Sequence, residues 1–195
     1  MKTYYDRRAP EYDEWYLGVG RFAERDRPGW EEDLADLRLT LEGLTRARTL
    51  DVACGTGFLT RHLPGEVRGL DQSDSMLAEA AKQCPDAAFV RGDALALPFE
   101  DAAFDRVFTA HFYGHLEEDD RQQFLREARR VAPELVVVDA SLHAGELREE
   151  WQERILNDGS QWEVYKRYFD PDELARELGG GETLFAGRWF VAVRA

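Results

Sequence analysis

The chain has 195 residues, with 44% hydrophobic and 33% charged side chains, and a formal net charge of −14 from 25 basic and 39 acidic residues. This length predicts a single domain large enough to bury a core. The acidic balance argues against a nucleic-acid partner, which requires a basic footprint. No segment approaches the roughly 18 consecutive apolar residues of a membrane span.

The amino-terminal residues carry no apolar core typical of a signal peptide. The two cysteines, Cys54 and Cys84, are too few for a disulfide framework. We therefore expect a cytoplasmic protein. Cys54 is interpreted as a small residue in a tight turn, with a catalytic nucleophile as the less favoured alternative.

Residues 4–16 form a short segment rich in aromatic side chains ahead of the first predicted strand. These are Tyr4, Tyr5, Tyr12, Trp15 and Tyr16. One interpretation is a helix that covers the sheet. The other is a lid, because tyrosine presents a flat apolar ring and a polar tip to a small ligand. We favour the lid, with Tyr5 and Tyr12 nearest the ligand.

A helix and the first strand follow a loop at residues 17–28. Leucines recur three and four residues apart within residues 30–44 and predict a helix there. The next apolar run leads into a glycine turn at residues 53–57 and then into a predicted helix over 58–63. Ligands bind at such turns in open α/β sheets, and the free N–H groups of a helix favour an anionic or polar ligand group.

The glycine turn does not match two common nucleotide-binding motifs. A dinucleotide fingerprint requires a third glycine three residues after the second, and Thr60 stands there. A phosphate-binding loop requires Gly-Lys followed by Ser or Thr, and no such sequence follows the turn. Gly55 and Gly57 nevertheless remove Cβ atoms where the chain turns and where a ligand would approach the backbone.

The second predicted strand, residues 66–71, ends in an acidic residue. A carboxylate at this place, Asp71, can accept hydrogen bonds from both ribose hydroxyls of an adenosine. The alternative is that it caps the predicted helix over residues 76–83. Ser73 or Asp74 can do that instead, so ribose binding is the favoured role.

Two histidines follow the fourth predicted strand, residues 104–110. His111 and His115 are four residues apart, but a zinc-protease motif requires glutamate directly after the first histidine, and Phe112 stands there. No metal site is therefore predicted. Histidine titrates near neutral pH, so either one is a candidate general base. The alternative is a packed histidine beside the ligand without a role in proton transfer.

The rest of the chain is predicted to complete the sheet. A helix over residues 117–131 precedes a β-branched run at 135–139 that is typical of a central parallel strand. A helix over 170–178, with Asp170 as its N-cap, precedes a hairpin within residues 182–193.

Residues 144–170 are the hardest to interpret. We predict a helix over 146–156 that is broken at 157–160. Aromatic residues crowd this region, and three cations lie among them: Arg154, Lys166 and Arg167. The region either caps the sheet or forms one wall of a substrate pocket in which cations receive an anionic group.

The stretch Leu50-Asp51-Val52-Ala53-Cys54-Gly55-Thr56-Gly57 resembles the first motif of class I S-adenosylmethionine-dependent methyltransferases. Residues 5–13 match the Tyr-Asp-x-x-Ala-x-x-Tyr-Asp segment of that family, and residues 92–94 match its Gly-Asp-Ala. The similarity to quinone-ring methyltransferases of the ubiquinone/menaquinone group is noticeable. The resemblance implies a doubly wound, Rossmann-like α/β fold. Its seven-stranded sheet would be mostly parallel, with a C-terminal antiparallel hairpin and helices on both faces.

The resemblance also implies roles for individual residues. In that family, the acid at Asp51 and the turn that follows hold the methionine end of the cofactor, and the acid at Asp93 takes the exocyclic amine of adenine. The residues we expect at the cofactor are Tyr5, Tyr12, Asp51, Ala53, Gly55, Thr56, Gly57, Asp71, Gln72, Met76, Gly92, Asp93, Ala94, Ala110 and His111. The family often has a histidine equivalent to His115 that is not the base, whereas His111 replaces a usual apolar residue and is the better acceptor-side candidate.

The expected activity is methyl transfer from S-adenosylmethionine to oxygen, nitrogen or carbon of a small-molecule acceptor, by in-line displacement, with S-adenosylhomocysteine as product. The alternatives are a regulatory module that binds the cofactor without turnover, and a nicotinamide-dependent oxidoreductase. We expect one domain over residues 1–195: a lid at 1–30, a cofactor-binding core at 31–142, a possible acceptor-pocket cap at 143–170, and the last helix and hairpin at 171–195.

Overall fold

The computed structural model describes residues 1–143 and 147–195. Seven strands form one sheet in the order β3-β2-β1-β4-β5-β9-β8. They are β1 (Ala47–Val52), β2 (Gly65–Asp71), β3 (Ala88–Arg91), β4 (Arg106–Ala110), β5 (Glu134–Ala140), β8 (Glu182–Ala186) and β9 (Phe190–Arg194). The first five are mutually parallel, and β9 runs antiparallel to both β5 and β8. The predicted sheet with its C-terminal antiparallel hairpin is confirmed.

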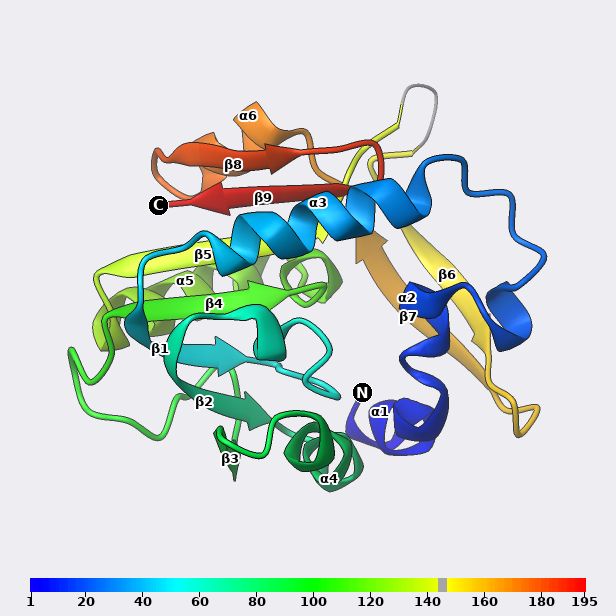
Figure 1. The fold of residues 1–195 in the computed structure, drawn as a ribbon, viewed down its shortest axis with the longest axis horizontal. Helices are drawn as coiled ribbons and strands as arrows, with labels where there is room; N and C mark the ends of the chain where they lie inside the picture. The colour runs from blue at the N-terminus through cyan, green and yellow to red at the C-terminus, as the bar shows by residue number, and fades with distance from the viewer. Residues whose placement is uncertain (144–146) are drawn as a thin grey trace.

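Helices cover both faces of this sheet (Figure 1). The leucines of α3 (Trp30–Glu42) pack with Val136 and Val138 of β5 on one face. Phe124 of α5 (Glu118–Val131) packs with Val137 on the other face, together with α6 (Pro171–Glu177). The alternation of neighbouring valines between the two clusters is what a strand buried on both faces requires.

Two predicted helix starts are confirmed by their caps. The hydroxyl of Ser73 accepts a hydrogen bond from the Met76 amide at the start of α4 (Asp74–Gln83). Asp170 accepts hydrogen bonds from the amides of Asp172 and Glu173 at the start of α6. Because Ser73 caps α4, the carboxylate at the end of β2 is not needed as its N-cap.

The predicted helix over residues 58–63 is wrong. Only a short 3-10 helix, Thr60–His62, lies between the glycine turn and β2. Pro64 forces Leu63 into an extended conformation, and too few residues remain to nucleate an α-helix. The expectation that a helix N-terminus faces the ligand from this loop therefore fails as well.

The predicted helix over residues 146–156 is also wrong. Residue 146 lies outside the described residues, but Glu149–Ile155 forms strand β6, which pairs antiparallel with β7 (Gln161–Arg167) as a separate two-stranded sheet. Side chains along β6 alternate between exposed and half-buried, which is the period of a strand. The tertiary contacts of this hairpin override the helix propensity of its Glu, Arg and Leu residues.

The N-terminal segment and the β6–β7 hairpin lie together at the carboxyl ends of the parallel strands (Figure 1). The segment contains α1 (Lys2–Arg8), a 3-10 helix (Ala9–Glu11) and α2 (Glu14–Leu17). Tyr4 of α1 is fully buried against Val164 and Trp162 of β7. Among the described helices, none has the length and apolar character needed to cross a membrane.

Candidate functional site

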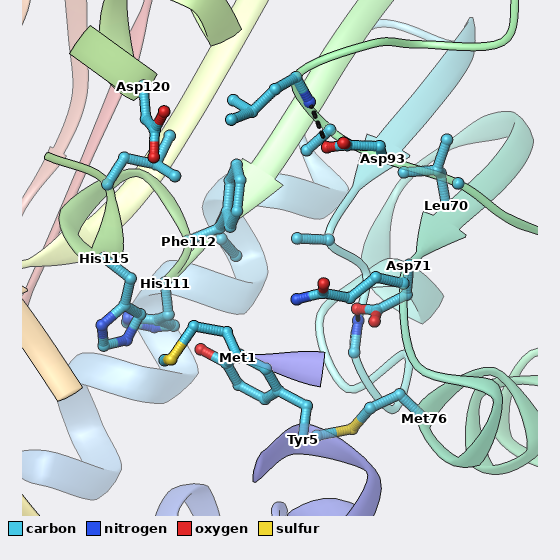
Figure 2. A pocket seen from close by; sticks show the side chains of 18 of the residues that line it. Met1, Tyr5, Leu70, Asp71, Met76, Asp93, His111, Phe112, His115 and Asp120 are labelled. Carbon is cyan, nitrogen blue, oxygen red and sulfur yellow. Dashed lines mark hydrogen bonds between the residues drawn. The ribbon is translucent and has the colours of Figure 1, made fainter. Parts of the chain in front are cut away.

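A cavity of about 250 Å³ opens at the carboxyl ends of the parallel strands. Strand β1 pairs with β2 on one side and β4 on the other, so the connections diverge there and leave a crevice. The predicted site residues that line this cavity are Tyr5, Tyr12, Ala53, Gly55, Asp71, Gln72, Met76, Gly92, Asp93, Ala94, Ala110, His111 and His115. In Figure 2, Asp71 and Asp93 lie on one side of the cavity, and His111 and His115 lie on the opposite side.

The glycine loop forms the floor of the crevice because its backbone turns sharply after β1. Ala53 and Gly55 both have positive φ angles, 59° and 55°. A non-glycine residue with positive φ is uncommon and is concentrated at functional sites. A Cβ atom added at Gly55 would lie 3.8 Å from the Tyr12 ring, an ordinary van der Waals contact, so the positive φ favours glycine here more than the available space does.

Three predicted cofactor residues lie outside the main cavity. Asp51 and Thr56 border a second, much smaller cavity of about 10 Å³, which shares Tyr12, Ala53 and Ala110 with the first. Gly57 borders neither: its Cα faces α4, where a Cβ atom would meet Cys84 Sγ at 3.0 Å. Its role in this structure is close packing of the loop on that helix.

Asp51 is a buried carboxylate that is only half satisfied. Asp51 is only 2% exposed, and its Oδ2 accepts a hydrogen bond from the Thr60 hydroxyl at 2.6 Å. Its Oδ1 atom is buried without a partner among the described residues. Burial raises the pKa of Asp51 to about 7, against the opposing effect of the Thr60 hydrogen bond. A cationic ligand group would satisfy this oxygen.

Asp71 is held by the backbone on two sides. Its Oδ2 accepts a hydrogen bond from the Gly55 amide at 3.0 Å, and its Oδ1 accepts one from the Ser73 amide at 2.9 Å. Burial raises its pKa, while these hydrogen bonds lower it. Each oxygen retains acceptor capacity, so the fixed carboxylate can accept two hydroxyl groups from a ligand.

Asp93 also has a structural role, as a cap for the turn that follows it. Its Oδ1 accepts a hydrogen bond from the Leu95 amide at 2.9 Å and so stabilises the turn after β3 (Figure 2). The residue is exposed at the cavity wall, and its other oxygen makes no hydrogen bond to the described residues. Turn stabilisation and ligand binding are therefore compatible at this position.

The N-terminal segment is fastened across the crevice by two carboxylates. Asp13 accepts hydrogen bonds from the Thr56 hydroxyl at 2.5 Å and from the Gln83 amide at 2.6 Å. Asp6 accepts one from the Ser73 hydroxyl at 2.6 Å. Burial raises the pKa of Tyr12 to about 12, so its phenol remains protonated at the cavity wall. These contacts hold the segment beside the crevice, and its function as a lid stays a prediction.

His111 is enclosed by aromatic rings. Its ring lies 4.9 Å from that of Trp15, 5.7 Å from Tyr16 and 5.5 Å from Phe190, measured between centroids. Its Nδ1 is 3.9 Å from Asp139 Oδ1, and its Nε2 is buried without a partner among the described residues. Burial lowers its pKa to about 3, against the opposing effect of Asp139. The backbone at His111 has a φ of 52°, a left-handed conformation.

His115 is oriented by the hairpin. Its Nδ1 lies 2.6 Å from the carbonyl oxygen of Tyr165, which can only accept, so Nδ1 carries the proton. Its Nε2 is then a free acceptor, and the residue lines the cavity. Burial, followed by the charge of Lys166, lowers its pKa to about 3.

Sequence reasoning missed a buried ion pair behind the histidines. Lys166 Nζ of β7 lies 2.5 Å from Asp139 Oδ1 at the end of β5, and the two residues are 5% and 0% exposed. Asp139 also accepts a hydrogen bond from the Gly114 amide at 2.8 Å. Asp139 stands out in the sequence as an acid at the end of a β-branched run. Its partner Lys166 comes from a hairpin that the sequence analysis did not predict.

Comparisons with known proteins agree with this geometry. Residues 50–134 match the family described as "Methyltransferase domain". The chain is 38% identical over 107 residues to demethylmenaquinone methyltransferase of Thermotoga maritima, covering 52% of this chain and 44% of the relative. It is 32% identical over 178 residues to the phthiotriol/phenolphthiotriol dimycocerosates methyltransferase of Mycobacterium leprae, covering 80% of this chain and 64% of the relative.

A solved structure described as "DhpI-SAH complex structure" superposes with a TM-score of 0.73 at 28% identity, covering 98% of this chain and 92% of that one. The chain is therefore similar to class I S-adenosylmethionine-dependent methyltransferases in sequence and in fold. It spans less than two thirds of the length of either relative.

The first prediction concerns Asp51 in the protein without a ligand. Its pKa in the folded state, about 7, lies above the ordinary aspartate value of 3.8, so the folded state keeps a proton that the unfolded state releases. The free energy of unfolding therefore falls as pH rises between these two pKa values, by up to about 1.4 kcal/mol per pH unit. Urea denaturation at several pH values should show this slope in the native protein and a reduced slope in Asp51→Asn. Equal slopes would contradict the assignment.

The second prediction concerns the lid. Asp13→Ala removes both hydrogen bonds that fasten the segment to Thr56 and Gln83. Hydrogen bonds to a charged acceptor contribute about 1.5–3 kcal/mol each, so local opening should become at least about tenfold more frequent. Trypsin cleavage after Arg7 and Arg8 should accelerate accordingly. Asp26→Ala, at an exposed loop position, is the control and should leave the rate unchanged.

Proposed function

We propose that this protein transfers the methyl group of S-adenosylmethionine to a small-molecule acceptor. The observation that carries the proposal is that Asp51, Asp71 and Asp93, from the ends of three neighbouring strands, border one crevice and its small side cavity. The cofactor presents an ammonium group, a ribose diol and an adenine amine, all of which are hydrogen-bond donors. Three carboxylates are the matching set of acceptors.

The unpartnered Oδ1 of Asp51 supports the fit most directly. This oxygen is a buried acceptor, and no described residue donates a hydrogen bond to it. In the proposed complex, Asp51 receives the ammonium group, Asp71 receives the ribose hydroxyls, and Asp93 receives the adenine amine. Gln72 and Met76 flank the ribose and adenine, since both line the same wall.

The bound cofactor supplies an electrophilic methyl group on a positively charged sulfur. The chain's own residues orient the reactants and exclude water. Tyr5 and Tyr12 line the cavity from the N-terminal segment, and His111, Phe112 and His115 line it from the loop after β4. Figure 2 shows the two histidines across the cavity from Asp71 and Asp93. Such alignment alone converts a bimolecular reaction into one within a single complex.

Neither histidine is proposed as a general base near neutral pH. A base functions best when its pKa lies near the working pH, and burial lowers the pKa of both to about 3. His111 is positioned by aromatic contacts, whereas Nε2 of His115 is free to accept a hydrogen bond. We therefore favour His115 over His111 as the residue that positions the acceptor, in contrast to the preference drawn from the sequence.

The two alternative functions, a nicotinamide-dependent oxidoreductase and a cofactor-binding module, make different demands on the site. The nicotinamide interpretation is disfavoured because Thr60, at the place of the third glycine, donates a buried hydrogen bond to Asp51. A cofactor-binding module without turnover would have the same nucleoside wall. Turnover by a panel of metabolite acceptors with labelled cofactor distinguishes the module from an enzyme.

We further propose a cytoplasmic location, which is supported by two free cysteines, Cys54 and Cys84. The acceptor is proposed to be a metabolite. The cavity of about 250 Å³ lies near the lower limit of the usual range for small-molecule sites. The net charge of −14 supports the exclusion of nucleic acid as substrate.

The third prediction tests cofactor binding by calorimetry with S-adenosylhomocysteine. The native protein should show saturable binding, and Asp71→Asn should weaken it about 10- to 100-fold, because hydrogen bonds to a charged group are lost. Asp74→Asn is the matched control, since Asp74 is exposed and forms ion pairs only with Lys2 and Arg91 among the described residues. Absence of binding, or equal affinity in Asp71→Asn, would overturn the proposal.

The fourth prediction concerns the charge of the histidines. The chain has four histidines, and the ring protons of His111 and His115 should show no titration between pH 5 and pH 8 in NMR spectra. Single His→Gln variants assign the signals. A midpoint above pH 6 for either residue would restore it as a candidate base.

A further inference from the structure

A single carboxylate joins the sheet, the loop after β4 and the β6–β7 hairpin. Asp139 at the end of β5 is fully buried, and its Oδ2 accepts a hydrogen bond from the Gly114 amide at 2.8 Å. Its Oδ1 accepts one from the Ala140 amide at 2.8 Å and lies 2.5 Å from Lys166 Nζ. Three elements distant in the sequence therefore meet at one side chain: β5, β7 and the 3-10 helix Tyr113–His115.

The cation that meets this carboxylate comes from the hairpin and is itself buried. Lys166 is 5% exposed, and Asp139 is the carboxylate with which it forms an ion pair. Replacing a buried ion pair by apolar side chains of similar volume is often neutral or stabilising. Packing β7 against the sheet does not by itself require such a pair, so its fixed geometry points to a role in positioning.

The loop after β4 packs tightly between β5 and β7. A Cβ atom added at Gly114 would lie 2.6 Å from the carbonyl oxygen of Arg167 and 2.9 Å from Asp139 Oδ1. Both distances are too short for a real Cβ atom, and glycine is typical of places where another backbone approaches this closely. The position of β7 is therefore transmitted directly to this loop.

His115 in the same loop takes its orientation from β7. Its Nδ1 lies 2.6 Å from the carbonyl oxygen of Tyr165, which can only accept, so the ring proton is on Nδ1. Its Nε2 is then unprotonated and forms no hydrogen bond to the residues that the structure describes. His115 lines the cavity, across from Asp71 and Asp93 (Figure 2). The atom that it offers to a ligand is thus determined by one carbonyl group.

That carbonyl group is rigidly linked to Lys166. The carbonyl of Tyr165 belongs to the planar peptide unit that ends at the Cα atom of Lys166. Neighbouring side chains of a strand point to opposite faces, and the Tyr165 hydroxyl donates a hydrogen bond to Glu149 at 2.7 Å. The side chain of Lys166, on the other face, therefore anchors this peptide unit toward Asp139.

Other contacts hold the hairpin to the sheet at a greater distance from His115. The Phe169 amide donates a hydrogen bond to the Ala140 carbonyl at 2.9 Å, and the Leu142 amide donates one to the Phe169 carbonyl at 2.9 Å. Phe169 lies three residues beyond Lys166, which is about 10 Å along an extended chain. These bonds keep the hairpin in place without the ion pair, but they do not fix the peptide unit beside His115.

The ion pair acts on His115 and not on the other histidine of the cavity. The distance from His111 Nδ1 to Asp139 Oδ1 is 3.9 Å, which is too long for a hydrogen bond. His111 is instead surrounded by the rings of Trp15, Tyr16 and Phe190.

We propose that Lys166 is a positioning residue for the acceptor side of the cavity. Paired with Asp139, it holds the Tyr165 carbonyl against His115 Nδ1 and so keeps His115 Nε2 unprotonated and available at the cavity. Lys166 does not line the cavity, so it acts through the carbonyl and the histidine. The inference rests on the proposed function, because the group that bonds to Nε2 is assigned to the methyl acceptor.

Proton–nitrogen correlation NMR of the isotope-labelled protein tests the inference without a substrate, because the nitrogen shifts of a histidine ring distinguish a protonated from an unprotonated nitrogen. His115→Gln assigns the signals. In the native protein near neutral pH, the His115 ring should be a single tautomer with its proton on Nδ1. Lys166→Met should change the ratio of the two tautomers about fivefold toward the Nε2-protonated form, which is the effect of losing one ordinary hydrogen bond.

Two further variants separate positioning from a loss of the fold. Lys166→Met leaves Asp139 buried without a counter-charge, which is strongly destabilising. The double variant Lys166→Met/Asp139→Asn removes both charges, keeps an acceptor for the Gly114 amide, and should show the same change of tautomer. Arg148→Gln is the matched control, because it removes the ion pair of Arg148 with Glu173 beside the start of β6 and should leave the tautomer unchanged.

Three results overturn the inference: a native His115 ring protonated on Nε2, an unchanged tautomer ratio in both the single and the double variant, or an equal change in Arg148→Gln. Calorimetry with S-adenosylhomocysteine on the same samples reports separately on the proposed function. The native protein and the Lys166 variants should bind it with equal affinity, because Asp71 and Asp93 lie across the cavity from His115 (Figure 2). Absence of binding in the native protein would contradict the proposed function and leave the tautomer result intact.

Discussion

The hydrogen bond from the Gly55 amide to Asp71 Oδ2, 3.0 Å long, joins the loop after β1 to the end of β2. It fixes the glycine loop against the strand end that borders the cavity. The loop backbone, with its positive φ angles, is held open by a carboxylate that also faces the cavity. The same side chain therefore supports the loop and faces the cavity. Asparagine in its place keeps one acceptor oxygen for the loop but loses the charge and the second acceptor.

Local sequence patterns predicted the parts of the structure that depend on local chemistry. The leucine spacing of α3, the caps at Ser73 and Asp170, and the acids at the ends of β2 and β3 each follow from neighbouring residues. The binding roles of the cavity residues stay predictions.

The wrong predictions concern segments whose structure is determined by contacts with residues distant in the sequence. The β6–β7 hairpin has polar inward residues such as Gln152 and Arg154, so its period of two carried no hydrophobic signal.

Electrostatics divides the cavity into two halves. The strand ends that carry Asp71 and Asp93 form an acceptor-rich half, whereas the opposite half contains His111 and His115, whose pKa values are lowered by burial. Under the proposed function, this separation gives the nucleoside and the acceptor different places to bind.

Tyr12 borders both the main cavity and the small cavity beside Asp51. The ring belongs to the segment that Asp6 and Asp13 fasten down. Under the proposed function, a nucleoside that spans Asp93 and Asp51 lies beneath this segment. Its entry then requires the segment to open, so its rate of arrival is governed by the chain rather than by diffusion.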